Sequence, residues 1–150
     1  MKILIELPTW LGDSVMTTPA IENLTNNIDN VQISLIGSDI SLQAIKYHPR
    51  VDKIYFLDKN YFKFFKKSTK LDHYDVFISF RSSFRSKLFK FLISSDKKFQ
   101  FNKRKYSRTH QVEKYNDFVN DCLKINTTAG PLKLFAQKKD IKKTKKLLGI

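Results

Sequence analysis

The chain has 150 residues, 41% of them hydrophobic, which is enough to bury one core and predicts a single domain. Lysine and arginine outnumber aspartate and glutamate by 28 to 14, and the formal charge of +14 favours an anionic partner: a nucleic acid, a phosphorylated glycan or an acidic membrane surface. The single cysteine, Cys122, excludes an intrachain disulfide and provides no metal-ligand spacing, as is typical of proteins from a reducing cytoplasm.

The sequence predicts neither a signal peptide nor a membrane-spanning segment. The first apolar run is interrupted by Glu6 and is too short for a signal peptide, and no run approaches the ~20 residues that a membrane span needs. We therefore expect a cytoplasmic protein, with at most peripheral contact with a membrane.

The N-terminal segment combines a strand, a tight loop and a helix start. Residues Lys2–Leu7 are largely apolar and predict a strand, Pro8 ends it, and Gly12-Asp13 leads into an apolar pattern of helical spacing. A loop between a parallel strand and a helix N-terminus is a common ligand site. Because Gly12 is the only glycine there, the loop lacks the dinucleotide fingerprint, which disfavours an NAD-dependent enzyme.

Asp13 has two interpretations. It is either an N-cap or first-turn acid of the helix, or a carboxylate at the mouth of the sheet that takes a proton from a substrate hydroxyl. Because of Pro19, two predictions for this helix are possible. Either one helix from Asp13 is kinked at Pro19, or a regular helix starts at Pro19 with Thr18 as its cap and follows a separate first turn.

The rest of the chain alternates between strand and helix patterns, which predicts an α/β, three-layer Rossmann-like domain with a mostly parallel sheet. Further strands are expected at 31–36, 51–57, 75–80 and 97–101, with helices at 40–47, 61–71 and 83–93 between them. A helix at 110–123 capped by Thr109, a last strand at 132–135 and a terminal helix at 138–148 complete the predicted order.

Basic residues cluster after the fourth and fifth predicted strands. Arg81, Ser83, Arg85 and Lys87 should emerge at the same edge as Asp13 and form an anion site, or Ser82 or Ser83 simply caps the helix and the basic residues form its solvated face. The basic loop 102–108 is also a candidate to bind an anion; the alternative is that its charged residues are simply solvated. His110, which follows this loop, either has a structural role or contacts the substrate.

The stretch 61–71 (YFKFFKKSTKL) also has two interpretations. Aromatic residues at helical spacing favour a helix that contributes to the core, whereas aromatic residues interleaved with lysines are also found in nucleic-acid-binding proteins.

The run LPTWLGDSVMTTPAIENL resembles the opening of the bacterial lipopolysaccharide heptosyltransferases, which are two-domain glycosyltransferases of the GT-B type in family 9. Two later stretches match more loosely, Tyr74-Asp75 through Ser83–Ser86 and His110–Tyr115. Pro8 and Trp10 are more similar to the second heptosyltransferase than to the first. The three matches occur in the expected order along the chain.

This resemblance implies the N-terminal, acceptor-binding half of an inverting enzyme that moves heptose from ADP-heptose to the lipopolysaccharide inner core. Asp13 matches the acid that the family is thought to use as its base. The donor would be held mainly by a C-terminal domain expected to begin where this chain ends, so the 150 residues alone should be inactive. We expect no metal or cofactor. Candidate contacts to the anionic acceptor, with its Kdo carboxylates and phosphates, are Trp10, Gly12, Arg81, Ser83, Arg85, Lys87, Lys103, Arg104, Arg108 and His110.

The net positive charge would also draw such a domain to the anionic cytoplasmic face of the inner membrane. The alternative from another functional class is a basic nucleic-acid-binding α/β domain. The charge and the stretch 61–71 support it, and the lack of an RRM, KH or zinc pattern disfavours it, so no nucleic-acid partner is expected.

Overall fold

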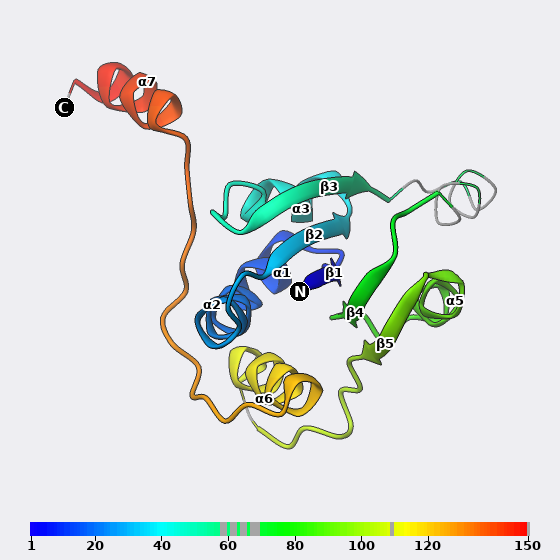
Figure 1. Cartoon of the computed structure of the whole chain (residues 1–150). Coiled ribbons are helices and arrows are strands. Elements are labelled where there is room, and N and C mark those ends of the chain that lie inside the picture. Colours follow the sequence, from blue (N-terminus) through cyan, green and yellow to red (C-terminus); the bar gives the residue numbers. More distant parts are fainter. Residues whose placement is uncertain (58–59, 61–62, 64–65, 67–69, 109, 150) are drawn as a thin grey trace.

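A five-stranded parallel sheet forms the centre of the computed structural model, which describes residues 1–57, 60, 63, 66, 70–108 and 110–149 (Figure 1). The strand order is β3-β2-β1-β4-β5, and every pair of neighbours is parallel. The prediction of an α/β domain with a mostly parallel sheet is confirmed. The strands are β1 (Lys2–Glu6), β2 (Gln32–Gly37), β3 (Val51–Phe56), β4 (Tyr74–Ser79) and β5 (Ser95–Gln100).

The central strand β1 is apolar on both faces because helices cover both. Ile3 and Ile5 face one core and Leu4 faces the other, and all three are fully buried. In register, Ile3 pairs with Ile33 of β2 and Val76 of β4. Continuous apolar runs of this kind are expected of parallel strands between two helical layers.

Helices lie on both sides of the sheet (Figure 1). Helices α2, α3 and α6 contribute to the larger core, whereas α5 covers β4 and β5 on the other face through Phe89, together with Ile93 just after the helix. The domain therefore has three layers. The described helices are α1 (Leu11–Met16), α2 (Thr18–Asn27), α3 (Asp39–Ile45), α5 (Phe84–Leu92), α6 (Gln111–Leu123) and α7 (Lys138–Leu148).

Aromatic contacts fix α6 against the ends of β4 and β5. The ring of Phe80 makes edge-on contacts with Tyr115 and Phe118, and Phe101 contacts the same two rings. Such edge-to-face pairs have a preferred geometry, so they orient α6 as well as bury it. Cys122 is buried further along the same face of α6, as an apolar residue would be.

Thr17 separates α1 from α2, so the structure is closer to the second possibility, in which a regular helix follows a separate first turn. Helix α2 begins at Thr18, and Pro19 occupies its first turn, where the missing N–H costs nothing. The cap residue is Thr17 rather than Thr18. The Thr18 hydroxyl instead donates to the carbonyl of Val15 at 2.8 Å and satisfies the oxygen that a proline N–H cannot reach.

The predicted strand at 132–135 is wrong. Residues 131–137 belong to no strand, and this segment lies against α2 instead. The Lys133 amide donates to the Thr18 hydroxyl at 3.1 Å, the Lys133 ammonium contacts Glu22 at 2.7 Å, and Phe135 packs edge-on against His48. Side chains of α2 thus take the place of a neighbouring strand.

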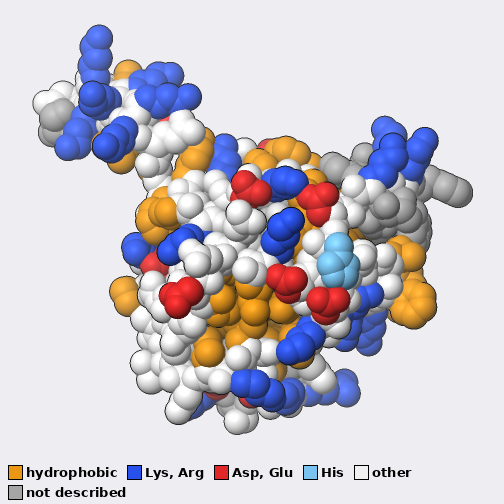
Figure 2. All heavy atoms as spheres, viewed as in Figure 1, with side chains coloured by type: hydrophobic (Ala, Val, Ile, Leu, Met, Phe, Trp, Pro, Cys, Tyr) orange, Lys and Arg blue, Asp and Glu red, His pale blue; other side chains and the backbone are white. Residues whose placement is uncertain are grey.

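Helix α7 stands apart from the sheet and the other helices, and lysines cover much of its surface (Figures 1 and 2). All its residues are exposed, including Leu147 and Leu148. The predicted helix at 61–71 lies largely outside the described residues. Thr109 also lies outside them, and the residue that caps α6 is His110.

Replacement of Phe89 with Ala should destabilise the fold by about 3 to 5 kcal/mol, because this ring is fully buried against Phe77 and its loss leaves a cavity. Phe91, on the same helix, is 83% exposed, so Phe91→Ala is a matched control with a change expected within about 0.5 kcal/mol. Urea unfolding of the two variants measures this difference, and equal losses would contradict the assigned orientation of α5.

Candidate functional site

Three neighbouring strands end around one hollow of about 300 Å³, which we call the Asp13 hollow. It lies beside the point where the strand order reverses between β1 and β4, the usual ligand position in open parallel sheets. Its lining comes from the loop after β1 (Pro8, Thr9, Trp10) with Asp13, the loop after β4 (Phe80–Ser83), the segment after β5 (Phe101, Lys103) and α6 (Gln111, Tyr115).

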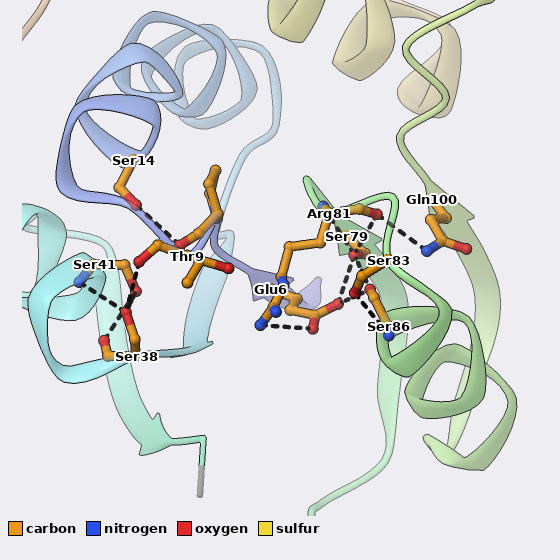
Figure 3. Close-up of polar contacts among 11 residues, drawn as sticks. Glu6, Thr9, Ser14, Ser38, Ser41, Ser79, Arg81, Ser83, Ser86 and Gln100 are labelled. Atoms are coloured by element: carbon orange, nitrogen blue, oxygen red, sulfur yellow. Dashed lines mark hydrogen bonds and ion pairs between the residues drawn. The ribbon is translucent and has the colours of Figure 1, made fainter. Parts of the chain in front are cut away.

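The loop that carries Asp13 is held by serine hydroxyls. The Ser14 hydroxyl donates to the carbonyl oxygens of Pro8 and Trp10 at 3.3 and 3.0 Å. The Ser38 hydroxyl donates to the carbonyl oxygen of Thr9 at 3.0 Å (Figure 3). These three bonds satisfy the backbone of a tight loop and fix its path between β1 and α1. The loop therefore presents Asp13 from a rigid support.

Asp13 is the third residue of α1 and does not cap it. The N-cap position belongs to Trp10, whose side chain makes no capping bond and is 71% exposed. The N-cap interpretation of Asp13 is therefore wrong, while its place in the first turn is confirmed. The half-buried carboxylate of Asp13 instead lines the hollow.

Tyr115 links the hollow to the aromatic core beneath it. Burial and the nearby charge of Asp13 raise the pKa of the Tyr115 phenol to about 12, and a hydrogen bond with Gln111 acts in the opposite direction. The phenol is thus protonated at neutral pH. A neutral hydroxyl beside a carboxylate provides a donor and acceptor in the wall of the hollow without adding charge.

Arg81 is anchored from behind by a buried glutamate. The Nη1 atom of Arg81 lies 3.7 Å from Glu6 Oε1, and only 16% of the Arg81 side chain is exposed. The backbone of Arg81 is held as well, since its carbonyl accepts from Gln100 Nε2 at 3.0 Å and its N–H donates to Ser79 Oγ at 3.2 Å (Figure 3). A guanidinium fixed in this way loses little freedom when it binds an anion.

Glu6 is 1% exposed and is the last residue of β1. The hydroxyls of Ser79 and Ser86 both donate to its Oε2, the first at 2.6 Å. Burial raises the pKa of Glu6 above its usual value of 4.5, while these two hydrogen bonds and the charges of Arg81 and Arg85 act in the opposite direction. The carboxyl group therefore ties β1, β4, α5 and the loop before α5 together.

Glu6 was not among the residues expected at the site. The signal available in the sequence is an acidic residue at the end of an apolar strand, because a charge in that position needs partners. Glu6 also provides a reason for Arg85, whose charge near the start of α5 opposes the helix dipole but lies close enough to lower the pKa of Glu6.

The other predicted contact residues divide between three places. Arg81, Ser83, Lys103 and Trp10 line the Asp13 hollow. Ser83 also caps α5, since its hydroxyl accepts from the Ser86 amide at 3.3 Å. Gly12 is exposed outside the hollow, with room for a Cβ. Lys87 is exposed on α5, and Arg104 is exposed on the loop after β5; neither lines the hollow.

Arg108 and His110 line a different hollow of about 580 Å³, which lies between α6 and residues 126–132. Arg108 is ion-paired with Asp117 at 3.1 Å, and His110 Nδ1 accepts from the Val112 amide at 3.3 Å as the N-cap of α6. We place the site in the smaller hollow because there a carboxylate and two cationic residues meet at the ends of three strands.

Metal-ligating side chains do not gather in groups of three anywhere in the described part of the chain. Within the same residues, no helix is long and apolar enough to cross a membrane.

Comparison with known proteins gives matches along the whole chain, although no family model matches. The chain is 34% identical over 157 residues to the lipooligosaccharide heptosyltransferase 2 of Campylobacter jejuni, covering 100% of this chain and 49% of the relative. It thus spans about half the length of the curated relatives it matches.

Two solved structures share the fold. A family 9 glycosyl transferase from Veillonella parvula superposes with a TM-score of 0.79 at 15% identity, over 99% of this chain and 50% of that one. The ADP-heptose lipopolysaccharide heptosyltransferase II of E. coli superposes with a TM-score of 0.70 at 19% identity, over 100% and 51%.

The raised pKa of Glu6 predicts a pH-dependent difference between the native protein and Glu6→Gln. From about pH 4.5 upward, the folded state retains a proton that the unfolded chain has lost, so the contribution of Glu6 to stability falls as the pH rises through its folded pKa. The amide of Gln is neutral throughout this window. As the pH rises, the free energy of unfolding of Glu6→Gln should therefore increase relative to that of the native protein.

Urea unfolding at a series of pH values measures this difference, with Glu113→Gln on the exposed surface of α6 as the matched control. A difference between Glu6→Gln and the native protein that stays constant across the window would show that the burial of Glu6 does not disfavour its charge.

Proposed function

The chain is a homologue of the family 9 heptosyltransferases that matches their N-terminal half, and from this premise we propose that it forms the acceptor-binding part of an inverting heptosyltransferase. The enzyme would transfer heptose from ADP-heptose to the inner core of lipopolysaccharide. The observation that carries this proposal is the Asp13 hollow, where one acidic residue and the cationic residues Arg81 and Lys103 line the same space.

Asp13 is the general base in this proposal. Its carboxylate takes the proton of an acceptor hydroxyl while the hydroxyl oxygen forms a bond to the anomeric carbon of the heptose. The bond from that carbon to the ADP oxygen breaks at the opposite face, and ADP leaves with the electron pair. Attack opposite to the leaving group inverts the anomeric configuration. The rigid loop of Asp13 supports this role, because a base must be held within hydrogen-bond reach of its proton.

Arg81 and Lys103 bind the acidic groups of the acceptor in this proposal. The inner core is anionic, and a guanidinium can hold a carboxylate or phosphate through two parallel hydrogen bonds. The Arg81 guanidinium is already positioned by Glu6, while Lys103 is exposed and adds a flexible charge to the lining of the hollow. Trp10, exposed at the rim, offers a flat apolar surface for a sugar ring.

The division of labour within the enzyme follows from the extent of the match. The 150 residues correspond to about half of each relative, and the described hollow holds cationic groups suited to an acidic glycan. We therefore assign acceptor binding to this half and most of the contacts to ADP-heptose to the other half of the complete enzyme. On this assignment the 150 residues alone bind acceptor without catalysing transfer.

Replacement of Asp13 with Asn in the complete enzyme should lower kcat by about 100-fold or more, because the amide cannot accept the proton. Folding and the affinity for ADP-heptose should change little. Single-turnover transfer to a soluble, delipidated acceptor measures the effect. Asp39→Asn, which alters an exposed first-turn acid of α3 outside the hollow, is the matched control. Transfer by Asp13→Asn at the rate of this control would remove Asp13 from the mechanism.

A further inference from the structure

Helix α5 has an apolar face turned away from the protein. Phe84, Leu88 and Phe91 follow one another at helical spacing and are 75%, 37% and 83% exposed. The opposite side of the helix contains the buried Ser86 and Phe89. A helix that covers a sheet normally exposes a polar face, so this outer row of large apolar side chains is unusual.

Hydrophobic side chains protrude at the right-hand edge of the molecule in Figure 2, where α5 lies in Figure 1. We call the surface formed by Phe84, Leu88 and Phe91 the α5 face. Its helix has the sequence FRSKLFKFL, which contains no acidic residue. The helix itself therefore adds no negative charge that would repel an anionic surface.

Lysines border the α5 face. Lys87 lies between Phe84 and Phe91 on the exposed side of the helix, and Lys90 follows one turn later. The Lys98 ammonium donates to the carbonyl of Phe91 at 3.3 Å, which places a third cation at the C-terminal end of the face. The nearby acid at the start of β5, Asp96, shares a hydrogen bond of 3.1 Å with His73.

We propose that the α5 face binds an anionic lipid bilayer. The aromatic rings enter the boundary between head groups and acyl chains, and the lysines contact the phosphates of the head groups. This combination of exposed aromatic residues with a cationic border is complementary to a bilayer and not to the neutral surface of a typical soluble partner. The proposal rests on the proposed function, because the acceptor of that reaction is anchored in a membrane by its lipid.

The position of the α5 face suits that acceptor. Helix α5 begins directly after Ser83, which lines the Asp13 hollow. A helix of nine residues is about 14 Å long, so the hollow opens within roughly one helix length of the bound bilayer. Sugars close to the lipid anchor could then enter the hollow while the anchor stays in the membrane.

Flotation of the complete enzyme with lipid vesicles tests the proposal. The enzyme should float with vesicles of phosphatidylcholine and phosphatidylglycerol and much less with phosphatidylcholine alone, and added salt should weaken binding. The double variant Phe84→Ser/Phe91→Ser should reduce the vesicle-bound fraction by about tenfold or more. The matched control is Leu147→Ser/Leu148→Ser, which removes two exposed apolar side chains from the lysine-rich helix α7.

Loss of binding in the α7 variant but not in the α5 variant would overturn the proposal, and so would equal binding by both. If the enzyme is a dimer in the absence of vesicles, and the α5 variant is a monomer that still binds vesicles, the face would instead be assigned to contact with a second copy of the chain. Transfer to the soluble acceptor should be unchanged in the α5 variant. Vesicle binding and transfer are separate readouts, so failure here is distinguishable from failure of the role of Asp13.

Discussion

The buried carboxyl group of Glu6 is the constraint on which the site depends. An acid at the end of a central strand is tolerated only where donors reach it, and here the donors come from the end of β4, the first turn of α5 and the loop between them. The contacts of these donors with the Glu6 carboxyl group therefore fix the position of the loop between β4 and α5 relative to β1. Arg81, whose guanidinium approaches Glu6 from the loop, also lines the Asp13 hollow, so one interaction stabilises the fold and holds a cationic residue of the site.

The same constraint relates the site to the outer surface. Ser86 contacts Glu6 from the inner side of α5, which turns the side of the helix that contains Phe84 and Phe91 towards solvent. The orientation of the helix thus follows from a polar contact within the domain as well as from the packing of Phe89. A hollow for an acidic glycan and a face suited to an anionic bilayer are consequently held by one rigid element.

Much of the fold could be predicted because its determinants are local. The apolar runs of β1, β2 and β4 and the helical spacing in α5 and α6 identify elements without knowledge of their partners. The segment 132–135 was predicted wrongly because alternation alone does not show whether a strand edge is available. The role of Glu6 was missed for a related reason: its partners Ser79 and Ser86 are 73 and 80 residues away. Likewise, Arg108 and His110 line a different hollow from Arg81 and Lys103, and this separation depends on the path of α6, which the sequence does not show.

The most direct test of the account is a structure of the complete enzyme with an acceptor analogue that retains its acidic groups. The account predicts a carboxylate or phosphate of the analogue on the Arg81 guanidinium, and a hydroxyl within about 2.6 to 3.2 Å of the Asp13 carboxylate. An analogue bound instead between α6 and residues 126–132, beside Arg108 and His110, would contradict it.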